Sequence, residues 1–221
     1  MKTRIALSLL IALTTVYSQR TTAQQTKPAE ELPKVEVGID FTALMSGSIE
    51  THPGGGARLT YNLNRHFALE GAAYFAAGNN GTGTITQGMF GIKAGQRFKK
   101  VGLFVKARPG VINLSQADYD LVPNGSSQPF LIGSFNEPPF QVVTRSRTDF
   151  ALDVGPVLEI YPKKKFFLRF DTGILLEWVG SRTFHSFQFD PVTGGFKPFT
   201  GTIPATKVGR VQLIAGVGFR F

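Results

Sequence analysis

The sequence predicts an all-β fold, an eight-stranded antiparallel up-and-down barrel, from three observations. Apolar and polar residues alternate along most of the chain, which is the period of a β-strand and not that of a helix. The alternating stretches are even in number, and short turns between them alternate with long loops. Glycine and phenylalanine are abundant, at 25 and 20 residues, as expected when only every second residue is apolar.

Eight stretches of the chain show this alternation. They are residues 35–43, 57–63, 67–75, 90–98, 101–108, 150–160, 166–174 and 210–221. Three connections are short and polar, at residues 64–66, 99–100 and 162–165. The other four are long, at residues 46–56, 76–84, 113–147 and 179–207. Short turns on one rim and long loops on the other are typical of an outer-membrane barrel.

Two prolines fall inside the predicted strands. Pro109 and Pro156 lack the N–H that a strand donates to its neighbour. We therefore expect a local irregularity at each, either a bulge or the end of a strand.

The N-terminal segment has the three-part layout of a secretory signal peptide. A basic start is followed by an apolar run from Ile5 to Ser18 and by small residues up to Ala23. The run is shorter than the roughly 20 residues that a spanning helix needs. We predict a signal peptide at residues 1–23, a short periplasmic linker at 24–33 and a barrel domain at 34–221, located in the outer membrane of a Gram-negative bacterium.

The two faces of the predicted strands differ in chemistry. In a membrane barrel the apolar face meets lipid and the polar face lines the lumen. Acids and bases are nearly balanced on the polar face, so we expect them to pair as a structural charge network in the lumen. This network comprises Glu36, Asp40, Arg58, Glu70, Lys93, Arg97, Lys106, Arg108, Asp153, Glu159, Arg169, Asp171, Arg210 and Arg220. A periplasmic lipocalin-like binder is an alternative eight-stranded barrel, but it requires an apolar interior.

The last strand ends with Val217, Phe219 and Phe221 on one face. Here the chain resembles bacterial outer-membrane barrels, which commonly end on such a strand. Over residues 34–221 its layout is similar to the small barrels of the OmpA/OmpX type, and residues 67–71 and 166–173 resemble their upward strands. The resemblance implies that outer-membrane lipid surrounds the protein and that the barrel-assembly machinery reads the last strand. It does not extend to the peptidoglycan-binding domain that typical OmpA proteins carry.

The sequence contains no pattern that indicates catalysis, a cofactor site or a metal site. His52, His66 and His185 lie in different predicted connections, and we expect each to be an exposed loop residue. His185 and Ser186 are adjacent, so on an extended segment they point to opposite sides, which is poor geometry for a base and its nucleophile. No cluster of basic residues is interleaved with aromatics on one segment, so nucleic acid is not an expected partner.

Aromatic residues concentrate in the longest connections. Residues 179–207 contain Phe184, Phe187, Phe189, Phe196 and Phe199. Long loops are often functional, so these rings are candidates for contact with an extracellular ligand or surface partner. In the other interpretation the strands extend above the membrane and the rings pack on one another.

Together these features predict a monomeric, non-enzymatic outer-membrane barrel. The interior of eight strands is just wide enough for side chains to fill, so we expect a largely plugged lumen. Its expected role is membrane integrity, or surface recognition and adhesion through long extracellular loops. The alternative is a narrow porin or small-solute channel. A lipid-modifying enzyme is a further alternative.

Overall fold

A computed structural model describes residues 33–47, 50–78, 83–123, 140–192 and 195–221. The expected signal peptide and all but the last residue of the expected linker lie outside these ranges. Within the described ranges, no helix is long and apolar enough to cross a membrane.

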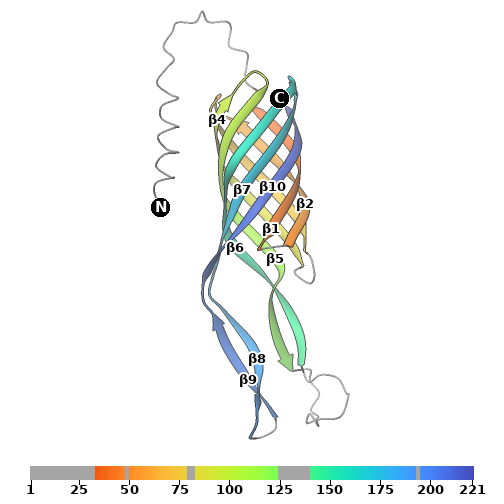
Figure 1. The fold of residues 1–221 in the computed structure, drawn as a ribbon, viewed down its shortest axis with the longest axis vertical. Helices are drawn as coiled ribbons and strands as arrows, with labels where there is room; N and C mark the ends of the chain where they lie inside the picture. The colour runs from red at the N-terminus through yellow and green to blue at the C-terminus, as the bar shows by residue number, and fades with distance from the viewer. Residues whose placement is uncertain (1–32, 48–49, 79–82, 124–139, 193–194) are drawn as a thin grey trace, which may run out of the picture. The chain divides into compact units, whose positions relative to one another are not determined.

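Eight antiparallel strands form a closed barrel, which confirms the predicted fold (Figure 1). Around the barrel the order is β1-β10-β7-β6-β5-β4-β3-β2. Closure is made by β1 and β10, whose register runs from Glu36↔Arg220 to Met45↔Val211. The strands are β1 (Val35–Ser46), β2 (Glu50–Asn62), β3 (Phe67–Ala77), β4 (Thr84–Arg97), β5 (Val101–Pro123), β6 (Phe140–Lys163), β7 (Phe166–Val179) and β10 (Thr206–Arg220).

Two of the long connections contain strands, as the strand-extension interpretation of these loops expected. Residues 182–203 form a separate two-stranded sheet of β8 (Arg182–Asp190) and β9 (Gly195–Ile203), which we call the β8–β9 hairpin. β5 and β6 also continue past the barrel wall and pair from Asp118↔Arg145 to Pro123↔Phe140, which we call the β5–β6 arm. Figure 1 shows both projecting from the end of the barrel opposite the short turns.

Strands β2 and β4 also begin earlier than expected, at Glu50 and Thr84. The added stretches are rich in glycine and threonine, and their outward positions lack large apolar residues. The period-two pattern was therefore too weak there to reveal them, although the added stretches pair with β1 and β3, respectively.

A local irregularity is present at each of the two prolines, as expected, but it is an interrupted ladder and neither a bulge nor a strand end. Around Pro109 the β4–β5 pairs Met89↔Gly110 and Ile92↔Ala107 keep one register, and the ladder is only interrupted between them. The β6–β7 ladder is interrupted in the same way at Pro156. Each proline still pairs on its other side, because its missing N–H affects one neighbour only. The register shifts occur elsewhere, between Leu114 and Asp118 and between Ile160 and Lys163.

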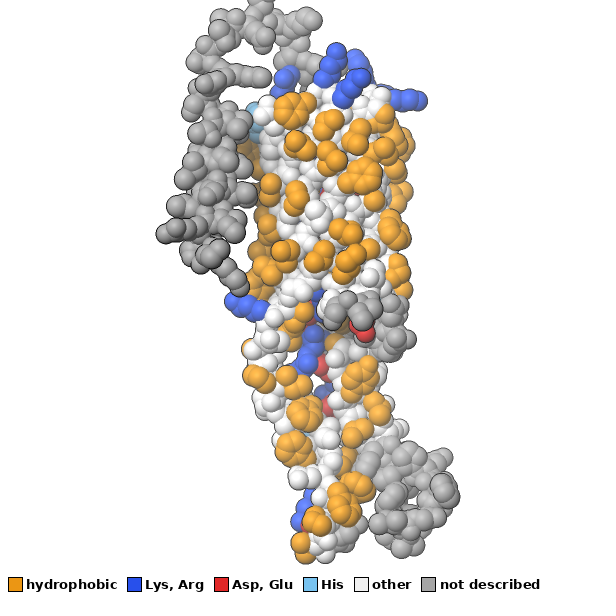
Figure 2. Space-filling view, viewed as in Figure 1, with side chains coloured by type: hydrophobic (Ala, Val, Ile, Leu, Met, Phe, Trp, Pro, Cys, Tyr) orange, Lys and Arg blue, Asp and Glu red, His pale blue; other side chains and the backbone are white. Residues whose placement is uncertain are grey.

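Apolar side chains cover the outer wall of the barrel (Figure 2). Large exposed ones include Ile39, Phe41, Leu59, Phe75, Phe90, Val105, Phe170, Ile174 and Leu213. Lys and Arg side chains gather at the end with the short turns, where Lys99, Lys100 and residues 163–165 are exposed. An apolar belt that ends at a charged rim is the surface expected of a barrel surrounded by lipid.

Aromatic rings mark the boundary at this rim. Phe67, Phe98, Phe219 and Phe221 are exposed close to the short turns. Phe166 packs edge-on against Phe219, with 5.8 Å between the ring centroids. Aromatic girdles occupy this position in outer-membrane barrels.

A charge on the apolar belt should destabilise the barrel, whereas the same charge on the hairpin should not. Phe41 lies mid-strand in β1 and is 59% exposed, and Phe199 of β9 is 47% exposed. We expect Phe41→Arg to lower the free energy of unfolding in lipid vesicles by about 2–4 kcal/mol, the cost of a cation at mid-bilayer. Phe199→Arg is the matched control and should lower the free energy of unfolding much less. Equal losses would place Phe41 outside the lipid belt.

Candidate functional site in the barrel interior

All fourteen residues of the predicted charge network point into the barrel. Thirteen are buried, and Arg97 is nearly so, with 8% of its side chain exposed. Even the largest of them, Arg108 and Arg169, have no exposed surface. Because an isolated buried charge is costly, each has to find partners inside the bore.

The centre of the network is Glu70 on β3, which binds arginines from two other strands. Arg108 of β5 and Arg169 of β7 each donate to its carboxylate at 2.8 Å. β3 and β7 are four strands apart in a ring of eight, so the Arg169–Glu70 pair crosses the full width of the bore. Its presence means that side chains from opposite walls touch and occupy the centre of the lumen.

A second set of contacts ties the neighbouring strands to this centre. Arg169 also donates to Asp171 at 2.6 Å, and Arg108 pairs with Asp153. Lys106 lies between these two aspartates, 2.9 Å from Asp153 and 3.2 Å from Asp171. Acids and bases therefore alternate through the centre, and each charge meets at least one opposite charge.

Near the short turns the network continues around Glu36 of β1. Arg97, Arg220 and Lys93 approach its carboxylate at 2.9, 3.3 and 3.6 Å. Lys93 also pairs with Glu159 of β6. The ring of Tyr161 lies under two of these cations, with the Arg220 guanidinium 4.4 Å from its centroid. Aromatic faces thus complete the closure at this end.

Glycines on β10 leave the room that the network occupies. A side chain on Gly216 would collide with the carboxylate of Asp40, and one on Gly218 would collide with the ring of Phe167. Asp40 accepts two hydrogen bonds from Arg58, at 2.7 and 2.8 Å. With Cβ atoms at the two glycine positions, the bore would be too narrow for this pair and ring.

Between the charged layers and the outer mouth of the bore lies an apolar layer that we did not predict from the sequence. Its members face inward and are buried: Leu44, Ala76, Ile85, Met89, Ile112, Leu114, Ala151 and Leu175. The predicted charge network therefore accounts for only part of the lumen. Most of these residues lie just past the ends of the strands as predicted, so extending each alternation by a few residues would have found them. Between the two regions, the Gln212 amide bonds Thr42 at 3.1 Å and Gln87 at 3.0 Å.

The outer mouth of the bore carries a second ionic cluster, which we call the mouth cluster: Arg147, Arg182, Arg210, Asp118, Asp149 and Glu177. Arg147 contacts all three acids, including Glu177 at 3.3 Å and Asp118 at 3.4 Å. Arg210 pairs with Glu177 at 2.9 Å, and Arg182 of β8 with Asp118 at 3.0 Å. A cavity of about 280 Å³ opens beside this cluster.

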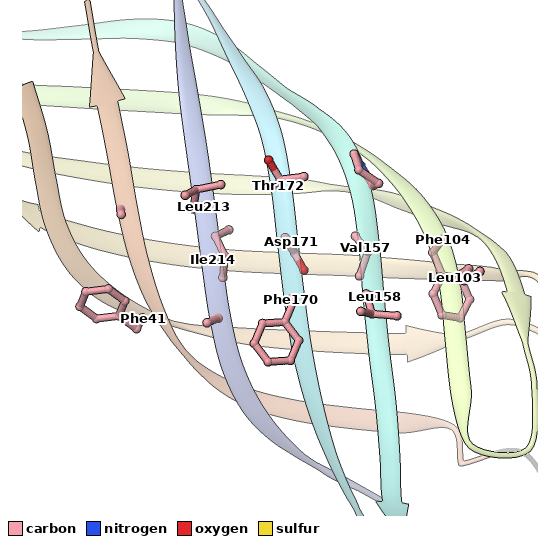
Figure 3. Close-up of a pocket in the computed structure, with 13 residues that line it drawn as sticks. Phe41, Leu103, Phe104, Val157, Leu158, Phe170, Asp171, Thr172, Leu213 and Ile214 are labelled. Carbon is pink, nitrogen blue, oxygen red and sulfur yellow. The ribbon is translucent and has the colours of Figure 1, made fainter. Parts of the chain in front are cut away.

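A larger hollow of about 630 Å³ lies on the outside of the barrel (Figure 3). It crosses β1, β10, β7, β6 and β5, and is bordered by outward side chains such as Phe41, Leu103, Phe170 and Leu213. Because this face of a membrane barrel meets acyl chains, we assign the hollow to the lipid-facing surface and not to a solute site.

The three histidines are not gathered in one place. His52 was expected in an exposed loop, but it lies buried in β2 with Nδ1 3.3 Å from the carbonyl oxygen of Ala77. His66 is exposed in a short turn. His185 lies in β8 opposite Thr200, whereas Ser186 lies opposite Phe199 on the other face. Among the residues that the structure describes, no three metal-ligating side chains cluster.

The five candidate recognition phenylalanines all lie on the β8–β9 hairpin. Phe184 packs against Phe199 with centroids 6.0 Å apart, and Phe189 against Phe196 at 5.7 Å. Alternation along the strands puts these two pairs on opposite faces, and Phe187 shares the face of Phe189. Strand extension and ring packing are therefore present, yet Phe189, Phe196 and Phe199 keep large exposed areas.

A closed eight-stranded barrel with an apolar belt and a charged interior defines the class of outer-membrane β-barrels. The family model described as "Outer membrane protein beta-barrel domain" matches residues 8–190, so the chain belongs to this family. The match begins within the expected signal peptide and stops before β9 and β10.

The comparison with solved structures finds outer-membrane barrels at low sequence identity. Neisserial surface protein A is 14% identical, with a TM-score of 0.46 over 85% of this chain and 96% of that one. Ail of Yersinia pestis is 14% identical over the same shares, with a TM-score of 0.41. The N-terminal barrel domain of Pseudomonas aeruginosa OprF is 14% identical, with a TM-score of 0.42 over 86% and 100%. A comparison with curated proteins gives no match.

Removing the arginine that crosses the bore should destabilise the barrel strongly. Arg169→Met leaves Asp171 and Glu70 buried with fewer counter-charges, and breaking such a buried pair costs about 3–5 kcal/mol. Lys197→Met is the matched control, because Lys197 pairs with Asp190 on the exposed hairpin. This exposed ion pair should contribute at most about 1 kcal/mol to the free energy of unfolding. Urea unfolding, followed by the fluorescence of the single tryptophan, measures both losses. Similar losses would mean that the central network does not hold the walls together.

Proposed function

We propose that this chain is a monomeric, non-enzymatic barrel of the Gram-negative outer membrane whose interior does not conduct solutes. Its role is membrane integrity and surface recognition or adhesion through the β5–β6 arm and the β8–β9 hairpin. The observation that carries the proposal is the Arg169–Glu70 pair, which occupies the bore from one wall to the other. With the lumen filled, the exposed chemistry of the protein lies in its projecting hairpins.

Two different barriers in series support the lack of conduction. The charged layers around Glu70 fill the bore with paired side chains. The apolar layer around Leu44, Ile112 and Leu175 offers an ion no ligands to replace its water. An ion would have to break the first barrier and then lose its hydration shell at the second.

The β8–β9 hairpin is tied to the β5–β6 arm by polar contacts near their bases. Asp118 of β5 pairs with Arg182 of β8, and the carboxylate of Asp120 accepts the backbone N–H of His185 at 3.0 Å. A two-stranded hairpin alone is marginally stable in water, so these contacts help to fix the aromatic pairs of the hairpin in position. A pre-ordered aromatic surface suits recognition because less entropy is lost on binding.

We also propose that the barrel-assembly machinery recognises β10 through Val217, Phe219 and Phe221. All three side chains are exposed on the outer face of the strand that closes the barrel. β10 completes the barrel by pairing with β1. Before this pairing forms, the outward side chains of β10 are available to the assembly machinery.

Single-channel recording in planar bilayers tests the proposed lack of conduction. We expect silence from the wild-type protein. The double variant Arg108→Ala, Arg169→Ala should also remain silent or nearly so, because the apolar layer stays intact. Adding Leu44→Ser and Leu175→Ser should produce openings, because polar groups then line that layer. Steady, ion-selective openings in the wild type would overturn the proposal and favour a narrow porin.

We propose that the β8–β9 hairpin faces the cell exterior and that the short turns face the periplasm. Single introduced cysteines can test this orientation, because the sequence contains no cysteine. Val192, in the turn of the β8–β9 hairpin, is 91% exposed, and Lys100 is exposed in a short turn. On intact cells, a maleimide attached to a polymer too large to cross the outer membrane should label Val192→Cys and leave Lys100→Cys unlabelled. After lysis both should react. Labelling of Lys100→Cys alone on intact cells would reverse the assigned orientation.

A further inference from the structure

We propose that the cavity at the outer mouth of the barrel binds a small organic anion that carries a compact apolar part. This site goes beyond the proposed function, because neither a closed lumen nor surface recognition requires it. The cavity of about 280 Å³ is lined by inward-facing side chains such as Ile85 and Arg210, together with the exposed Glu50 and Tyr119. We place its opening at the outer mouth, on the aqueous side. A water molecule takes about 30 Å³, so the cavity has room for about nine waters, or a ligand with a similar number of non-hydrogen atoms.

The wall of the cavity carries an excess of positive charge. Arg147, Arg182 and Arg210 all line it, whereas the three acids of the mouth cluster do not. Those acids hold the guanidinium groups from behind and so fix their orientation. Glu50 is the one acid in the lining, and with 57% of its side chain exposed it lies at the rim. The lining is therefore arranged to receive negative charge.

Two of the arginines have N–H groups without a hydrogen-bond acceptor among the described residues. Arg210 uses Nε on Glu177 at 2.9 Å and Nη1 on Ser46 at 2.7 Å, and among the described residues its Nη2 has no partner. Arg182 forms its ion pair with Asp118 through Nη1, at 3.0 Å, whereas its Nε is buried without a hydrogen-bond acceptor in the described part of the chain. A buried donor without a partner, such as Arg182 Nε, is destabilising. The oxygens of a carboxylate would satisfy such donors.

The floor of the cavity is apolar. Ile85 and Leu114 line it, and both belong to the apolar layer that closes the bore beneath. Ala117 adds a further apolar contact from β5. A simple inorganic ion cannot use this floor, whereas a ring or short chain attached to the carboxylate would cover it and exclude water.

The cavity owes its shape to the irregularity of β5. Between Leu114 and Asp118 the strand contains two more residues than its partner stretch on β6, and this register shift brings Gln116 and Ala117 into the lining. Ser115 is held by the backbone N–H of Thr84, which donates to its hydroxyl at 2.7 Å. Bulges are over-represented at barrel rims and beside functional sites, where they re-aim side chains.

Calorimetric titration of the refolded wild-type protein with three matched probes tests the proposal. Phenylacetate has ten non-hydrogen atoms and both required parts, 2-phenylethanol has the ring without the charge, and acetate has the charge without the ring. We expect saturable binding of phenylacetate at one site, and at least about tenfold weaker binding of each of the other two. Equal affinity for 2-phenylethanol would indicate simple partitioning into apolar surface and would overturn the proposal.

Variants then locate the site. Arg210→Gln and Arg182→Gln should each weaken phenylacetate binding by about tenfold. Arg145→Gln is the matched control, because Arg145 is exposed, pairs with Asp120 and does not line the cavity; its affinity should change by less than about twofold. Heat-dependent gel migration verifies folding of each variant. Arg182 lies in the hairpin outside the barrel, so its variant remains informative if Arg210→Gln fails to fold. Unchanged affinity in Arg182→Gln and in any folded Arg210→Gln would overturn the assignment.

Discussion

The interior depends on one constraint, the closure of eight strands into a ring by the pairing of β1 with β10. In lipid, every backbone N–H and C=O of the wall needs a partner, and only a ring without edges supplies one for each. A ring of eight is so narrow that side chains from opposite walls meet. Charged residues on the inward face therefore have to pair across the bore, and glycines have to leave room where bulky groups cross.

The interior is layered, and the layers have different physical roles. Ion pairs around Glu36 and Glu70 join strands that are distant in sequence, so each pair acts as a tie between walls. Buried pairs of this kind add little net stability compared with an apolar filling, but they tolerate few alternative arrangements. The apolar layer near the outer mouth contributes burial without any requirement for partners. The part of the bore around Glu36 and Glu70 is therefore specified by charge, and the part beneath the outer mouth is filled by apolar packing.

Outside the membrane the constraints change. The β5–β6 arm and the β8–β9 hairpin are no longer part of the ring, so their edges are not satisfied by closure. The chain compensates with aromatic pairs on both faces of the hairpin and with contacts from Asp118 and Asp120 to β8. The mouth cluster lies at this junction, and its acids orient the arginines of the cavity while they fasten the hairpin to β5.

Successive side chains of a strand point to opposite faces, so an alternating sequence directly specifies which residues share a face. The sequence alone was therefore sufficient to assign which face of each strand meets lipid. The pattern correctly placed Glu70 and Arg169 inside and Phe41 outside. It missed the apolar layer and the burial of His52, because alternation is weak in glycine- and threonine-rich stretches and strand ends are poorly marked. For the segment that forms the β8–β9 hairpin, it left strand extension as one of two interpretations. The contact of Arg169 with Glu70, and the cavity that three arginines share, could not be read from any local pattern. Such contacts depend on strand order and register around the ring, and these arise from pairing between segments far apart in the chain.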